Sequence, residues 1–421
     1  MMKILVVSIF LVAYILLVFK KGHPFIILGG AIAALFASRS LGLNEALSSI
    51  NYNVLGVFWG TMVLSGLFIN SLVPAYLATK LVDRSKNVGL AMISVCLLAG
   101  FISAFVENVA TVLIVAPIAF EVAKKLKTNP IPFLIGIAVS ANLQGCATMV
   151  GDSPSIILAL SSGMSFMDFF WMKGRPGITF AVELGAVASF YVLYLLFKKY
   201  RQPVTQMEEV RVKTWFPTVL LGLMMLSLAA SSFVKNKHPY TIAFICIIYG
   251  VIGLLWHEIK HRESISLVKD LDWHTFFFLI GIFVLVGSLT SRGIIDDIAN
   301  FIIRHTQGSQ FIAFTVIVWL SVFLSAFIDN IPYTIAMIPV AKLVAQSLGV
   351  GPELFLFGLL IGASLGGNIT PIGASANVVA VGLLRKDGHH VKFMDFVKIG
   401  LPFTLAAVSV AYLFLWFVWS K

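Results

Sequence analysis

Long apolar stretches, separated by short polar segments, follow one another along almost the whole chain. In the first half they cover about residues 4–20, 24–40, 52–72, 130–162 and 175–197. Each approaches or exceeds the roughly 20 residues that an α-helix needs to cross the hydrocarbon core of a bilayer. The alternating strands typical of a membrane β-barrel are not the pattern seen. The pattern therefore predicts an all-α polytopic membrane protein.

A segment in each half departs from a plain span. In the first half, about residues 88–126 are apolar on both sides of Glu107-Asn108. A carboxylate and an amide at mid-depth are costly in lipid, so we expect a re-entrant hairpin with these residues at its tip. The amphipathic segments Tyr76–Val82 and Asp296–Ile303 are expected to lie along the membrane interface and to connect a static part to a moving one.

The two halves of the chain repeat each other. FISAFVENVATVLIVAPIA, starting at Phe101, matches FLSAFIDNIPYTIAMIPVA, starting at Phe323, and the displacement of 222 residues continues without a gap. About twenty of 55 positions are identical, including glycine and polar positions that low-complexity apolar sequence does not keep in register. The predicted division is a first repeat over 1–200, a cytoplasmic linker over 201–214 and a second repeat over 215–421.

Each repeat is predicted to contain about five spans, one of them broken, plus the re-entrant hairpin. An odd number of spans makes the second repeat inverted relative to the first. The positive clusters then fall on the linker side, which the positive-inside rule places in the cytoplasm, with both termini outside. These clusters are Lys20-Lys21, Lys80 to Lys86, Lys124 to Lys127, Lys198 to Arg201, Lys260 to Arg262 and Arg385-Lys386.

Composition supports a membrane protein. The chain is 59% hydrophobic and 12% charged, against roughly 25% charged residues in soluble domains. Its net charge of +11 resides in short loops, so it indicates orientation and not nucleic-acid binding. The stretch Ile4 to Val18 has no small-residue cleavage site after it and is expected to remain as a span. The three cysteines have no paired spacing, so the sequence supports neither a disulfide framework nor a zinc site.

Four polar clusters interrupt the apolar sequence and form the candidate binding site. Those at the hairpin tips are Glu107, Asn108 and Thr111, and Asp329, Asn330 and Thr334. Those that break a span are Asn142, Gly145, Thr148, Gly151, Asp152 and Ser153, and Gly367, Asn368, Thr370, Gly373, Ser375 and Asn377. Packing between helices explains any single Ser, Thr or Gly about equally well. The acids Glu107, Asp329 and Asp152 are functional by default inside a membrane.

Glycine and proline interrupt the hydrogen bonds of a membrane-spanning helix and leave backbone carbonyl oxygens unpaired. These oxygens are hard ligands suited to Na⁺, whereas the N-termini of the half-helices present N–H donors to an anion. The expected bound ion is Na⁺, and no other cofactor is expected. Proton exchange by Glu107 or Asp329 would couple transport as well, and the residues leave both alternatives open. The expected sodium ligands lie at Asn108, Gly145, Gly151, Asn330, Gly367 and Gly373.

These motifs resemble the ion transporter superfamily. The resemblance rests on ENVATVLIVAPIA at Glu107, NLQGCATMVGDSPSIIL at Asn142 and GGNITPIGASANVVAVGLL at Gly366. It is strongest toward the branch of arsenite permeases, D-type sodium/proton antiporters and the melanosomal P protein, which is related to the divalent anion/sodium symporters. The resemblance implies a homodimer that works as an elevator, with a scaffold and a transport subdomain drawn from both repeats.

The tips depart from two members of that superfamily. The dicarboxylate symporters have Ser-Asn-Thr at both tips, where this chain has Glu107-Asn108-Val109 and Asp329-Asn330-Ile331. An acid beside a dicarboxylate would repel it. Arsenite permeases have Asn-Asp at the first tip, in place of Glu-Asn. Both differences argue against assigning a dicarboxylate or arsenite to this chain as its substrate on the basis of the resemblance.

The leading hypothesis is a cation-coupled (Na⁺ or H⁺) secondary active transporter of a small inorganic or organic anion, in the cell's inner (plasma) membrane. The alternatives are a Na⁺/H⁺ antiporter and an arsenite or antimonite efflux permease. A channel is less consistent with inverted broken-helix repeats. An intramembrane enzyme would need a nucleophile or metal constellation, which the pattern lacks, and the absence of a Walker A loop argues against an ATPase.

Overall fold

A computed structural model describes residues 2–18, 24–125, 128–204, 210–262 and 264–420. It is an all-α membrane protein, with helices at every span predicted in the first half. Lys20, Lys21 and Lys127 of the predicted positive clusters lie outside the described residues. The helices of the first half are α1 (Met2–Val18), α2 (Pro24–Ala37), α3 (Leu43–Ser49), α4 (Tyr52–Asn70), α5 (Val73–Asp83), α6 (Val88–Ser103), α7 (Asn108–Lys125), α8 (Pro130–Gly145), α9 (Ser153–Ser161) and α10 (Ile178–Phe197).

The second half repeats this order of helices. They are α11 (Phe216–Ser231), α12 (Thr241–His261), α13 (Ser264–Lys269), α14 (Trp273–Ser291), α15 (Ile294–His305), α16 (Gln310–Ser325), α17 (Asn330–Ser347), α18 (Glu353–Gly366), α19 (Ser375–Lys386) and α20 (Phe393–Trp419). A 3₁₀ turn, η2 (Gly367–Ile369), follows α18. Among the described residues, α4, α10, α12, α14 and α20 are long and apolar enough to cross a membrane, and shorter apolar helices accompany them.

Equivalent capping residues begin the hairpins of the two repeats. Asn87 Oδ1 accepts a hydrogen bond from Leu90 N at 2.9 Å at the start of α6. Ser309 Oγ, displaced by 222 residues, accepts one from Ile312 N at 3.4 Å at the start of α16. These side chains satisfy backbone donors that a helix start otherwise leaves free. The duplication therefore extends to the local chemistry that starts each helix.

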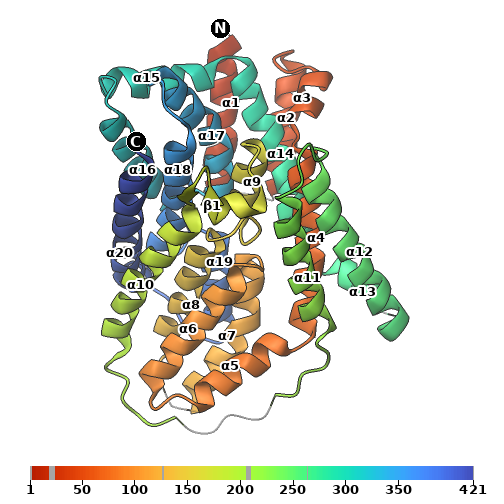
Figure 1. Cartoon of the computed structure of the whole chain (residues 1–421), viewed down its shortest axis with the longest axis vertical. Coiled ribbons are helices and arrows are strands. Elements are labelled where there is room, and N and C mark those ends of the chain that lie inside the picture. Colours follow the sequence, from red (N-terminus) through yellow and green to blue (C-terminus); the bar gives the residue numbers. More distant parts are fainter. Residues whose placement is uncertain (1, 19–23, 126–127, 205–209, 263, 421) are drawn as a thin grey trace.

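The two repeats have opposite orientations (Figure 1). Helices α5 and α15, which we call the arm helices, lie at the bottom and at the top of the view, respectively. The α6–α7 hairpin lies below the α16–α17 hairpin. Both ends of the chain are toward the top, whereas the described residues between α10 and α11 run along the bottom. We call these two ends the termini side and the linker side.

The helices pack as two sets. In the first, here called the scaffold set, α4 packs on α12 and α2 packs on α14, so each repeat completes the other. The second, the hairpin set, comprises α6 to α10 and α16 to α20, in which α10 packs along α20, α6 and α7 against α8, and α16 and α17 against α18. The arm helices α5 and α15 join the sets in sequence. Contacts between the sets are formed chiefly by α4 with α7 and α9, by α14 with α17, and by the arm helices.

One feature has no counterpart in the second repeat. Phe166–Phe169 forms a 3₁₀ turn, η1, followed by a small hairpin of β1 (Trp171–Met172) and β2 (Arg175–Pro176). The span predicted over 175–197 therefore starts at Ile178, since Arg175 and Pro176 pair in the hairpin. The equivalent sequence in the second repeat, starting at Phe393, is instead the first turn of α20.

Candidate functional site

A chain of asparagine side chains joins the two repeats at the centre of the hairpin set. Asn108 Nδ2 donates to Asn142 Oδ1 at 3.1 Å. Asn142 Nδ2 in turn donates to Asn368 Oδ1 at 2.8 Å and to Asn377 Oδ1 at 2.9 Å. All four side chains are buried, and the first tip is further fixed by Ser103 Oγ, which donates to Asn108 Oδ1 at 2.7 Å. One hairpin tip is thus connected to the break of the opposite repeat.

The three intramembrane acids cap helices that begin at the site. Glu107 Oε2 accepts from Val109 N at 2.8 Å, and Asp329 Oδ1 accepts from Ile331 N at 3.0 Å, at equivalent positions of α7 and α17. Asp152 Oδ1 accepts from Ser155 N at 2.8 Å at the start of α9. A carboxylate at a helix N-terminus is stabilised by the free N–H groups and the helix dipole.

The acids also make contacts beyond their own helices. Asp152 Oδ2 accepts from Ser364 Oγ of the other repeat at 3.1 Å, and Asp329 Oδ2 accepts from Ser375 Oγ at 3.3 Å. The residue equivalent to Asp152 in the second repeat is Ala374. The site is therefore symmetric at its tips and asymmetric in charge at its breaks.

Two equivalent threonines attach each break to the hairpin of the same repeat. Thr148 Oγ1 donates to the carbonyl oxygen of Ala104, and Thr370 Oγ1 donates to that of Ala326. Both carbonyls lie at the C-terminal end of the first hairpin helix. Each break therefore stays beside the negative end of a helix dipole.

Backbone carbonyls converge on one glycine in each break. A Cβ added at Gly151 would lie 2.7 Å from the Ser103 carbonyl oxygen and 2.9 Å from that of Ala104. A Cβ added at Gly373 would lie 2.8 Å from both Ser325 O and Ala326 O. The carbonyls of Gly145 and Gly367 also lie against these positions. We call each of these two sets of carbonyl oxygens a cradle. Their oxygens are of the kind that binds hard cations.

A small cavity lies between both hairpin tips and the N-termini of α9 and α19. Its volume is about 20 Å³, enough for a water molecule or a dehydrated ion of similar size. Ser153 Oγ lines it, and this buried atom has no hydrogen-bond partner among the described residues. The polar residues that line the cavity are Glu107, Asn108, Asn142, Asp152, Ser153, Asn330 and Ser375.

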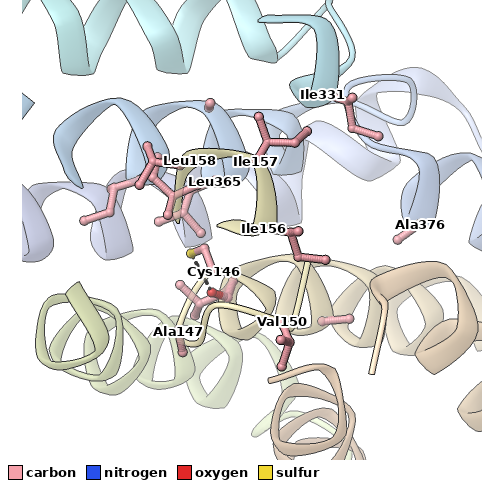
Figure 2. Packing of buried hydrophobic residues seen from close by; sticks show 14 of the residues in the cluster. Cys146, Ala147, Val150, Ile156, Ile157, Leu158, Ile331, Leu365 and Ala376 are labelled. Atoms are coloured by element: carbon pink, nitrogen blue, oxygen red, sulfur yellow. Dashed lines mark hydrogen bonds between the residues drawn. The ribbon is translucent and has the colours of Figure 1, made fainter. Parts of the chain in front are cut away.

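Apolar packing isolates this region. Figure 2 shows Ile157 and Leu158 of α9 beside Leu365 of α18, with Cys146, Ala147 and Val150 around the first break. These residues are buried. An ion or polar group at the cavity therefore depends on the tips and breaks for its partners, since the surrounding side chains offer few.

Not every predicted site residue reaches the cavity. Thr111 Oγ1 donates within its own hairpin to Val106 O at 3.3 Å, and Thr334 Oγ1 is buried without a hydrogen-bond partner among the described residues. Asn368 and Asn377 contribute through Asn142. The sequence patterns did not single out Ser103 and Ser364, whose hydroxyls are common in membrane helices.

Two larger pockets lie between the scaffold set and the hairpin set. The termini-side pocket has a volume of about 530 Å³ and lies beside α14 and α17. The linker-side pocket has a volume of about 120 Å³ and lies beside α4 and α7, at the equivalent place in the first repeat. Glu107 and Val109 line both this pocket and the central cavity. The central cavity and the linker-side pocket are therefore neighbours that share two lining residues.

The sequence of the chain matches a known family of transporters. The sequence model of the citrate transporter family (CitMHS) matches residues 14–362. The chain belongs to the citrate transporter family. This family is part of the ion transporter superfamily, so the resemblance seen in the tip and break motifs is confirmed.

The relatives of this citrate transporter family member include proteins that are named as transporters. The uncharacterized transporter Rv2684 of Mycobacterium tuberculosis is 29% identical and aligns over 99% of this chain and 98% of its own length. The P protein of Mus musculus is 26% identical over 97% of this chain and 59% of its own length. The fold is similar to the Alcanivorax borkumensis YdaH transporter, with a TM-score of 0.61, 15% identity and coverage of 99% and 98%.

Proposed function

We propose that this transporter carries a small inorganic or organic anion across the cell's inner (plasma) membrane and couples this transport to the movement of Na⁺ or H⁺. The observation that carries the proposal is the central cavity, where two oppositely oriented hairpin tips and two half-helix N-termini meet. A site shared by inverted repeats is accessible from either side by symmetric movements. The N-termini of α9 and α19 supply positive dipole ends for an anion.

The cradles support sodium as the coupling ion. Each places carbonyl oxygens from a hairpin and from a broken span around one glycine, Gly151 or Gly373. Asn108 lies so close to Gly145 that a Cβ added at Gly145 would clash with Asn108 Oδ1. Oxygen ligands without a softer nitrogen or sulfur donor suit Na⁺. Two cradles would hold two sodium ions, one for each repeat.

The packing supports an elevator mechanism. The hairpin set holds the whole candidate site, and the arm helices connect it to the scaffold set. Pockets separate the two sets on both sides of the membrane. A hairpin set that slides as a body along a scaffold dimer would expose the central site to one side and then the other.

A sodium/proton antiporter is the second candidate. The central cavity of about 20 Å³ accepts a dehydrated ion more readily than a polycarboxylate, and Glu107 and Asp152 line it. In this alternative the cation is the substrate, and these acids exchange protons with it.

Purified protein in proteoliposomes separates the two candidates. Antiport needs only Na⁺ and a pH gradient, whereas coupled anion transport requires a second solute such as citrate, phosphate or arsenite on one side. Anion flux driven by a sodium or proton gradient supports the proposal. Sodium-driven acidification or alkalinisation in the absence of any such anion would instead favour antiport.

An asparagine pair tests the site itself. Asn108→Ala removes the side chain at the first tip, and Asn300→Ala, at an exposed position of α15, is the matched control. Sodium should raise the melting temperature of the wild type and of Asn300→Ala, because a ligand that binds only the folded state stabilises it. Asn108→Ala should lose most of this rise. An unchanged sodium response in Asn108→Ala contradicts the site assignment.

A further inference from the structure

A lysine projects from the C-terminal third of a largely apolar helix beside the termini-side pocket. Lys342 belongs to α17, is half-buried, and lines the pocket of about 530 Å³. The equivalent residue of the first repeat is Phe120. A charged side chain on a membrane helix is costly unless it reaches water or a polar partner. Lys342 therefore distinguishes the termini-side pocket from its symmetric counterpart.

The environment of Lys342 leaves its charge available. Its Nζ donates to Ser161 O, in the last turn of α9, at 2.5 Å. An ammonium group has three donors, so this bond uses one of them. Glu45 is the one carboxylate among the described residues that line the pocket, and its Oε2 accepts from Gly42 N at 2.9 Å, capping α3. No ion pair between Lys342 and a described carboxylate is present.

The pocket has the size and lining of a small-molecule site. Its volume is within the roughly 300–1,000 Å³ of known ligand pockets, and it is far larger than the central cavity. Ser48, Ser49, Thr290 and Ser291 place hydroxyl groups around it, and Phe283, Ile335 and Ile338 supply apolar surface. The counterpart on the linker side is lined by Glu107, Asp270 and Asp272, with no basic residue among its described lining residues.

We propose that the Lys342 pocket is an access site for a small water-soluble anion bearing carboxylate or phosphate oxygens, which binds there before it reaches the central site. This proposal deepens the proposed function, because it rests on an anion being the transported solute. The ammonium of Lys342 would attract the anion and donate to it with the N–H groups that the bond to Ser161 O leaves free. A phospholipid headgroup offers the same oxygens, so the test must separate the two sources.

Titration calorimetry on the full chain in neutral detergent, at constant sodium concentration, provides the test. Citrate and inorganic phosphate are the probes, each measured with and without added anionic phospholipid. Lys342→Gln keeps a donor for Ser161 O and removes the charge, and Lys342→Arg keeps the charge. Lys269→Gln, exposed on α13, removes one positive charge on the linker side as a matched control.

The wild type and Lys269→Gln should bind at least one probe with equal affinity. Lys342→Gln should raise its Kd about tenfold, as expected for loss of one charged hydrogen bond, and Lys342→Arg should remain close to the wild type. In transport assays, Lys342→Gln should raise KM for the anion with little change in kcat. Equal Kd values for Lys342→Gln and wild type, no binding by wild type, or binding of phospholipid alone would each overturn the proposal.

Failure of the proposed function is recognised separately. It appears in proteoliposomes as a sodium-driven pH change without anion flux, and at the site as an unchanged sodium response in Asn108→Ala, at a tip whose contacts do not include Lys342. The calorimetric comparison of Lys342→Gln with Lys342→Arg does not depend on that response, since sodium is held constant.

Discussion

Leu72 and Gly293 adopt the same left-handed backbone conformation, with φ of 61° and 67°, at the residue before each arm helix. Leu72 holds this conformation although a side chain disfavours it by roughly 1–2 kcal/mol. Its carbonyl accepts from Tyr76 N at 3.0 Å, which continues the chain into α5. At the other junction, Arg292 Nη2 donates to Ser40 O at 2.7 Å. The two points where the scaffold set turns into an arm are thus built alike.

The left-handed junction leads to a stability prediction. Gly293→Ala should lower the free energy of unfolding by about 1 kcal/mol, because alanine disfavours a positive φ. A Cβ at Gly293 meets no atom closer than 3.4 Å, so crowding contributes little. Gly222→Ala, inside α11 with no atom within 4 Å of its Cβ, is the control and should be neutral or stabilising. Thermal unfolding in detergent measures both, and equal shifts would contradict this account.

Gly145 should be essential for the position of Asn108. Gly145→Ala places a methyl group where Asn108 Oδ1 lies, so the tip must move. We expect loss of the sodium-induced thermal shift and a destabilisation of about 1–3 kcal/mol, typical of overpacking. Gly382→Ala in α19, where a Cβ meets nothing within 4 Å, should retain the sodium response. Retention of that response in Gly145→Ala as well would disprove the link between glycine and tip.

The threonine bonds should stabilise the two repeats alike. Thr148→Val and Thr370→Val each remove the hydroxyl that satisfies a buried hairpin carbonyl, at a cost of about 1–3 kcal/mol. Thr→Ser at either position keeps the hydroxyl and should cost less. Melting temperatures of the four variants give the comparison. Equal melting temperatures for the Val and Ser variants would show that the hydroxyl groups do not stabilise the broken spans.

Asp152 combines a structural role with a charge, and two substitutions separate them. Asp152→Ala removes the cap on Ser155 N and the acceptor for Ser364 Oγ, and should cost about 1–2 kcal/mol of stability. Asp152→Asn keeps an oxygen for the cap and should fold almost normally, but with an altered ion dependence of transport. Transport by Asp152→Asn with the wild-type dependence on Na⁺ and pH would restrict Asp152 to capping.

The duplication made much of this fold predictable from sequence. Because polar and glycine positions stay in register over 222 residues, the hairpins and the broken spans could be located before their structure was known. The short β1–β2 hairpin could not, since it depends on distant partners. Trp419 Nε1 donates to Pro176 O at 3.1 Å, and Lys173 pairs with Glu353 at 2.5 Å.

Most residues that line the central cavity were named from the sequence as candidates, but their contacts could not be predicted. Nothing in the local pattern indicates that Asn142 donates to Asn377, 235 positions along the chain. Lys342 did carry a local signal, because a basic residue interrupts an apolar helix where the other repeat has Phe120. The difference between the two repeats at this position therefore marks Lys342.

The unequal pockets beside α4 and α14 have a consequence for the opposite half of the transport cycle. Equivalent helices border the two pockets, α4 and α7 in one and α14 and α17 in the other, yet one pocket measures about 120 Å³ and the other about 530 Å³. If each repeat took the arrangement now seen in its partner, the pocket beside α4 would widen and the pocket beside α14 would narrow. Under the proposed elevator mechanism, a single conformation of the chain thus contains a template for the two-fold-related state that opens on the other side.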